Sequence, residues 1–225
     1  MYSLSMHTIG KSLGYAGFVL VAMLVFIVPQ AQAQDHPDRD KFHAEVAHAL
    51  LESYEALATI STYHARDMMP DNRDEMHEKA AHGFKHALEL FAVEPRMKDH
   101  EDKNELHAEV AHALLEAHET LAIIADYHAR GAMPKARDEL HDVVAHGFKQ
   151  ALEKFGVEFD MPKHEDRQEF HGQVAHALLE SYSGLSTISH YHAIGSMPGK
   201  RDEMHEQAAH GFKHTLELFG VKTNM

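Results

Sequence analysis

The sequence contains no cysteine. This absence excludes disulfide bonds, zinc sites built on thiolates, iron–sulfur clusters and covalent attachment of a c-type haem. Any metal bound by the chain must therefore rest on histidine, carboxylate, methionine, backbone or water ligands.

Positive charge is also scarce. The chain has 21 Lys and Arg against 35 Asp and Glu, which gives a formal charge of −14 with histidine neutral. Nucleic-acid phosphates require a basic face, so we expect no nucleic-acid partner. An acidic surface suits cations, although it also serves solubility alone.

Long apolar runs are lacking after the N-terminal region. There, Lys11 precedes an apolar run over residues 16–28, and the small-residue pattern Ala-Gln-Ala follows at 31–33. This pattern predicts a secretory signal over residues 1–33, with an uncleaved N-terminal anchor as the alternative. We therefore expect a periplasmic or secreted protein without a membrane span after cleavage. The remaining 192 residues, three times 64, carry 20 basic and 35 acidic residues, hence a formal charge of −15.

Familiar catalytic motifs are missing as well. The chain has no HExxH pair, no nucleophile elbow and no phosphate-binding loop. A metal–hydroxide mechanism would need an open coordination position, which no residue pattern marks. The sequence therefore favours a binding protein over an enzyme.

What the chain does have is a 64-residue unit that occurs three times, over residues 34–97, 98–161 and 162–225. Half of the aligned columns from residue 36 to 97, 31 in all, are identical in the three units. Of the seven histidine columns in the first unit, six keep histidine in all three units, and only His86 is lost, as Gln150, before returning as His214. Eighteen of the 23 histidines belong to these six columns. Imidazole is the commonest protein metal ligand, so the repeated pattern indicates metal, haem or proton binding.

Hydrophobic periodicity predicts two helices per unit, over residues 40–66 and 72–91 in the first. Met69 and Pro70 break the pattern between them, as Met133-Pro134 and Met197-Pro198 do later. Charged stretches over 94–103 and 158–167 read as linkers. Each unit is then a helical hairpin that cannot bury its own apolar stripe. We expect an all-α fold of three tandem hairpins, forming either a six-helix bundle or a short α-solenoid.

Helical-wheel positions divide the histidines into two groups. His64 and His43 fall toward the apolar stripe of the first helix, and His77 lies beside that of the second. His64 and His77 also reach similar heights beside the predicted turn. They are our leading candidate metal ligands, together with their repeats His128, His141, His192 and His205.

The remaining candidates lie mainly on the polar side. His48, Glu52 and His82 fall there, and residues four apart share a helix face that suits chelation. Imidazole with carboxylate suits Zn, Cu(II), Ni and Co, so we expect binding of such ions for buffering, sequestration or delivery. This second group comprises His43, His48, His82, His107, His112, His146, His171, His176, His210, Glu52, Glu116 and Glu180.

One spacing has a counterpart in a known family. The pattern His48-x3-Glu52 with His82-x3-His86 resembles the ligand spacing of hemerythrin-type di-iron bundles, and Gln150 departs from it in the second unit. This resemblance implies a di-iron centre in a four-helix bundle and an oxygen-binding or redox role.

Two further alternatives remain open. The pair His64 and His77 could ligate a non-covalent haem from two sides. The third hypothesis is an interaction protein switched by acid, because protonation of all 22 histidines after residue 33 would change the formal charge from −15 to +7.

Overall fold

The structure is a computed structural model of the chain and describes residues 37–68, 71–96, 102–132, 134–160, 166–196 and 199–223. The predicted signal over 1–33, the Met-Pro pair at 69–70 and its counterpart at 197–198 lie outside these ranges.

Six α-helices and no strand make up the described part of the chain. The longer helices are α1 (Pro37–His64), α3 (Lys103–Ala129) and α5 (Arg167–Ala193). They alternate with the shorter α2 (Arg73–Leu90), α4 (Arg137–Lys154) and α6 (Arg201–Leu218). The predicted helices at 40–66 and 72–91 agree with α1 and α2 to within three residues at each end.

Local chemistry explains several of these helix ends. The Asp102 and Asp166 carboxylates cap α3 and α5, each accepting hydrogen bonds from two backbone N–H groups of the first turn. Beyond the long helices the chain turns through a left-handed residue, which is Gly131 after α3, Gly195 after α5 and Asp67 after α1. After α1 the Met68 N–H reaches back to the Tyr63 carbonyl, closing the last turn. Their hydrogen bonds show that the Asp102 and Asp166 side chains serve as helix caps.

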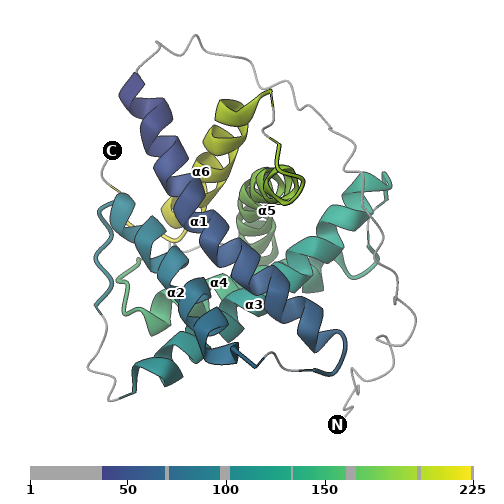
Figure 1. Cartoon of the computed structure of the whole chain (residues 1–225). Coiled ribbons are helices and arrows are strands. Elements are labelled where there is room, and N and C mark those ends of the chain that lie inside the picture. The colour runs from purple at the N-terminus through teal and green to yellow at the C-terminus, as the bar shows by residue number, and fades with distance from the viewer. Residues whose placement is uncertain are drawn as a thin grey trace.

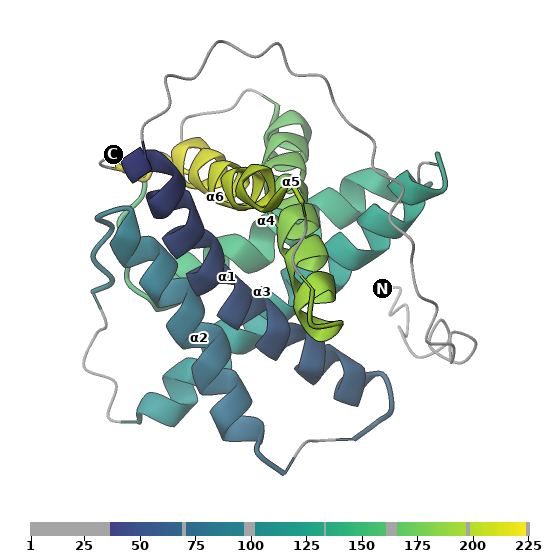
Figure 2. The same ribbon diagram turned by 45° about the horizontal axis from the view of Figure 1, so that its top comes forward.

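The helices pack in a closed ring rather than in an open row. Each helix contacts the next one along the chain, and α6 also contacts α1, which brings the first and last helices side by side (Figures 1 and 2). The three long helices also contact one another in the middle. A helical bundle therefore describes the fold, because an open solenoid would leave its first and last helices apart.

The core contains two rings of aromatic side chains from residues 64 positions apart. Phe84, Phe148 and Phe212 contact one another, with ring centroids 5.6 to 6.0 Å apart. Between the long helices, Tyr54, His118 and Tyr182 form a second ring with centroids 5.0 to 5.4 Å apart. The first ring takes one residue from each short helix and the second takes one from each long helix, so burial of the aromatic groups ties together helices from the whole described chain.

Glycine lets the short helices approach the long ones closely. A Cβ atom on Gly83 would lie 2.5 Å from the Ala49 carbonyl oxygen and 2.6 Å from the Ser53 nitrogen. Gly211 would meet α5 in the same way. These approaches hold α2 on α1 and α6 on α5, and thus fix the height at which the histidines of each pair meet.

None of the helices in the described ranges is both long enough and apolar enough to cross a membrane.

Candidate functional site

His64 and His77 lie close together at one end of the α1–α2 pair, and a third histidine joins them from α3. The His112 ring stacks near His64 at 6.4 Å between centroids and meets His77 edge-on at 4.9 Å. We call His64, His77 and His112 the first histidine cluster. The sequence predicted the first two as a pair, whereas the contribution of His112 from the following unit was not predicted.

Two more clusters repeat this arrangement. In the second histidine cluster, His176 of α5 lies 6.2 Å from His128 and 5.3 Å from His141. In the third, His48 of α1 lies 5.1 Å from His205. His192 completes the third cluster, since it interacts electrostatically with His205. The third cluster forms because α6 packs on α1, so closure of the ring creates it.

Ring separations in the clusters are near those of shared metal ligands. Imidazoles that share a tetrahedral zinc ion, with Zn–N bonds of about 2.1 Å, have ring centres about 5 Å apart. The three pairs that involve His77, His141 and His205 are 4.9 to 5.3 Å apart. His64 and His128 stand farther out, at 6.4 and 6.2 Å from the third ring. In the described ranges, no group of three or more His, Asp or Glu is placed so that it could hold a metal ion as the side chains stand. Ligation would therefore require these outer rings to rotate inward.

One histidine of each cluster is buried. His77 and His205 are 2% exposed and His141 is 5% exposed, which confirms the predicted orientation of His77 toward the core. The Nε2 atom of His77 and the Nδ1 atom of His205 are buried and have no hydrogen-bond partner. Because an unpaired buried polar atom is costly, these nitrogens are the atoms for which a ligand would bring the largest gain.

Protonation is disfavoured at the buried members. Burial lowers the pKa of His77, His141 and His205, and the neighbouring cluster histidine lowers each pKa further because two imidazolium charges repel. Burial likewise lowers the pKa of His128, with His176 adding to the effect. Neutral imidazole is the form that binds metal, so the clusters favour the ligand form at neutral pH.

A hydrogen bond fixes the tautomer of His176, the exposed histidine of the second cluster. The Nδ1–H group of His176 donates to the Gly172 carbonyl oxygen at 2.6 Å. This bond leaves the Nε2 lone pair free, and metal-binding histidines commonly orient themselves in this way. Gly172 stands where the other units have Ala44 and Ala108. A Cβ atom on Gly172 would lie 3.5 Å from the Nδ1 atom of His141, which is an ordinary van der Waals contact, so an alanine would fit here as well.

His43, His107 and His171 lie apart from the clusters. The Nδ1 atom of His171 hydrogen-bonds the Asp142 carboxylate from α4. His43 is buried, which lowers its pKa, while nearby Glu206 opposes that shift. His107 has a buried Nδ1 atom without a partner. His171 is paired with a carboxylate, and His43 has Arg39 and Glu206 near it with a single histidine, His210, so we do not include this group in the proposed metal sites.

The predicted polar-side residues do not all lie together, because Glu52 and His48 have different neighbours. The Nδ1 atom of His82 lies 3.4 Å from the Oε2 atom of Glu52, and the His82 and His86 rings stack at 6.4 Å. His48 instead contacts His205. The structure thus divides the residues of the hemerythrin-like spacing between two places. In the second unit, the Nε2 atom of His146 lies 2.8 Å from the Nε2 atom of Gln150.

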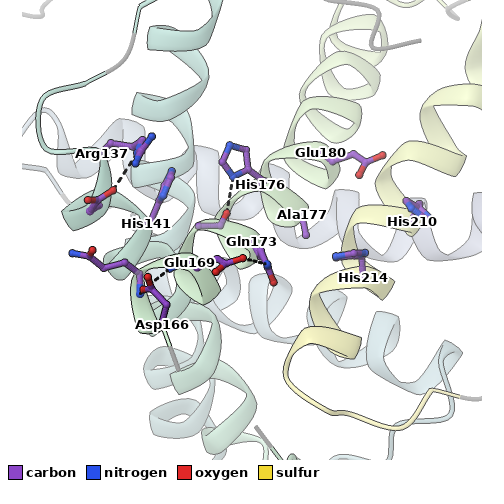
Figure 3. A pocket seen from close by; sticks show the side chains of 13 residues that line it. Arg137, His141, Asp166, Glu169, Gln173, His176, Ala177, Glu180, His210 and His214 are labelled. Atoms are coloured by element: carbon purple, nitrogen blue, oxygen red, sulfur yellow. Dashed lines mark hydrogen bonds and ion pairs between the residues drawn. The ribbon is translucent and has the colours of Figure 1, made fainter. Parts of the chain in front are cut away.

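A cavity of about 790 Å³ adjoins the second cluster. It is lined by residues of α4, α5 and α6, including His141 and His176 on one side and His210 and His214 on the other (Figure 3). Glu180 extends from α5 between the two sides, and Arg137 is paired with Asp138. Most of the lining residues have polar side chains, and four of them, Asp138, Asp166, Glu169 and Glu180, are acidic, which suits a hydrated cation.

No known family, curated protein or solved structure matches this chain.

Proposed function

We propose that this protein binds divalent transition-metal ions, one at each of the three histidine clusters. The observation that carries the proposal recurs at three junctions: a buried histidine lies 4.9 to 5.3 Å from a histidine of the neighbouring helix pair, and a further histidine interacts electrostatically with the buried one.

Each cluster would supply three nitrogen ligands and leave the fourth position to water or a carboxylate. Such a set suits Zn(II), Cu(II), Ni(II) and Co(II), whose affinities follow the Irving–Williams order. His77, His141 and His205 would anchor the ion because packing holds them, while the outer histidines rotate to complete the site. The lowered pKa values support binding near neutral pH, since few protons would need to be displaced.

The wider role proposed is buffering, sequestration or delivery of such ions in the periplasm or outside the cell. The apolar run and the Ala-Gln-Ala pattern before residue 34 support export. We also propose that the bundle consists of three tandem 64-residue hairpins. The two aromatic rings support this organisation, because their members are 64 residues apart. Each metal would then bridge two hairpins and tie the ring together.

Native mass spectrometry of the tag-free protein with added Zn²⁺, Cu²⁺ or Ni²⁺ tests this proposal. We expect three tightly held ions, and one fewer after each of the substitutions His112→Ala, His176→Ala and His48→Ala. These side chains are exposed, so their removal should spare the fold. His190→Ala is the matched control, because His190 is exposed and belongs to no cluster. Unchanged stoichiometry in all three variants would overturn the proposal.

Acid switching is the second candidate, and one observation favours it. His118 is 8% exposed between two tyrosines, and burial lowers its pKa to about 4. Protonation of this central residue would oppose the packing of the long helices. An unfolding transition between pH 7 and 4 that persists in metal-free buffer would support the switch, whereas a metal-free protein that is equally stable across this range would contradict it.

A further inference from the structure

A second kind of side-chain group lies outside the three histidine clusters and also combines histidines with a carboxylate. Each such group consists of three residues: two that lie four positions apart on a short helix, and a glutamate on the preceding long helix. In the first unit these are His82, His86 and Glu52, and in the third they are His210, His214 and Glu180. The proposed function above does not involve these residues.

The histidine pair of each group lies near its glutamate, but in the described ranges no such set of three is already placed to hold an ion, so binding requires the side chains to rotate. His82 lies 3.4 Å from Glu52, and its ring stacks on His86 at 6.4 Å with an interplanar angle of 7°. His210 and His214 are 6.3 Å apart, and both line the cavity together with Glu180. Figure 3 shows Glu180 extending toward α6, where the two histidines stand one turn apart. Residues at i and i+4 on a helix are well placed to chelate one ion.

We propose that Glu180 with His210 and His214, and Glu52 with His82 and His86, bind a divalent transition-metal ion each at the surface. Two imidazoles and one carboxylate make a borderline-hard donor set that suits Zn(II), Cu(II) and Ni(II). Both histidines of each pair are exposed, so the ion keeps water ligands and exchanges faster than an ion held by a buried histidine.

The cavity gives the site in the third unit a further role. His141 and His176 of the second cluster line the same cavity as Glu180, His210 and His214. Glu180 is one helical turn from His176 on α5, so the carboxylate stands between the two sites. The surface site is therefore an entry position from which a hydrated ion reaches the second cluster without crossing packed side chains.

The middle unit supplies a natural control. Its corresponding residues are Glu116, His146 and Gln150, and the Gln150 amide occupies the position of the second imidazole. An amide is a poor ligand for these ions compared with imidazole, so the middle unit lacks a site of this kind. The protein therefore carries two such surface sites rather than three.

Zn²⁺ titration of the full protein, followed by calorimetry and by the NMR signals of the histidine rings, tests the inference. We expect two weaker ions beyond the three that the clusters bind. His214→Gln and His86→Gln should each remove one weaker ion, and Gln150→His should add one. Gain of an ion in Gln150→His cannot result from unfolding, and Gln150→Ala is its matched control.

The outcomes separate this inference from the proposed function. If Gln150→His adds no ion and His214→Gln loses none, the surface sites do not exist, whatever the clusters bind. If His112→Ala leaves the tight ions unchanged while His214→Gln removes a weaker one, the cluster proposal fails and the surface sites stand. For the entry role, His214→Gln should slow Zn²⁺ loading of the second cluster relative to the first in stopped-flow mixing. Equal loading rates would overturn that role.

Discussion

His77 of α2 and His112 of α3 meet with their ring centroids 4.9 Å apart, although they lie on different helices and 35 residues apart in the sequence. The first ring is buried and the second is exposed. Neither sequence spacing nor helical periodicity relates them, because their contact depends on how α2 packs on α3. This contact and its two counterparts form the basis of the proposed metal sites.

Removal of His112 should raise the pKa of His77. The imidazolium of His112 repels a proton on His77, and burial is the larger cause of the lowered pKa, so the variant His112→Ala should restore only part of the shift. An NMR titration of the histidine ring protons without metal measures this. His146→Ala should leave His77 unchanged, because His146 lies outside the first cluster. An unshifted His77 in the His112→Ala variant would mean that the two rings do not meet.

The substitution His118→Tyr should remove acid sensitivity from the centre of the bundle. Burial lowers the pKa of His118 to about 4 in the folded protein, against about 6.5 when unfolded. The unfolded chain therefore takes up this proton at a higher pH than the folded protein does. As a result, the free energy of unfolding is largest above pH 6.5 and falls by about 3 kcal/mol in total as the pH drops toward 4. Tyr54 and Tyr182 occupy the corresponding positions, so tyrosine fits the ring of three.

Urea unfolding at pH 7 and pH 5 in metal-free buffer measures this effect. The wild type should lose more stability between the two values than His118→Tyr does. His146→Gln provides the control, since an exposed histidine should change the pH dependence little. Equal losses in wild type and His118→Tyr would contradict the assignment of His118 as the acid-sensitive residue.

The substitution Gly83→Ala should destabilise the bundle. Its Cβ atom would lie 2.5 Å from the Ala49 carbonyl oxygen and 2.6 Å from the Ser53 nitrogen, and these backbone atoms cannot yield without separating α1 from α2. We expect a loss of about 1–3 kcal/mol in the free energy of unfolding. Gly199→Ala is the matched control, because nothing lies within 4 Å of its added Cβ. Equal stability of the two variants in chemical unfolding would show that the helices are farther apart than described.

The substitution Asp67→Gly should stabilise the protein. Asp67 has a φ angle of 52°, in the left-handed region that favours glycine, and its counterparts are Gly131 and Gly195. Relief of this strain should raise the free energy of unfolding by up to about 1 kcal/mol. A higher midpoint of thermal unfolding would show it. Asp71→Gly, an exposed change outside the helices, should bring no such gain.

Much of the local structure followed from the sequence. Apolar periodicity predicted α1 and α2 to within three residues, because each helix must bury one stripe of its surface. The same pattern placed His77 toward the core and His82 toward solvent, as the structure has them. The proximity of His64 and His77 also followed, since a short connection makes two helices antiparallel neighbours.

Only the tertiary structure decided which helices meet and whether the row of helices closes. His48 has His205 as its neighbour because α6 packs on α1, an arrangement between opposite ends of the chain. Sequence periodicity describes each helix face but not its partner, since apolar stripes on several helices are interchangeable by hydrophobicity alone. Side-chain shape decides among them, through the three interlocked phenylalanines and the close approach at Gly83. The sequence alone thus determined which histidines lie on which helix. The packing of the helices determined which three imidazoles lie next to one another.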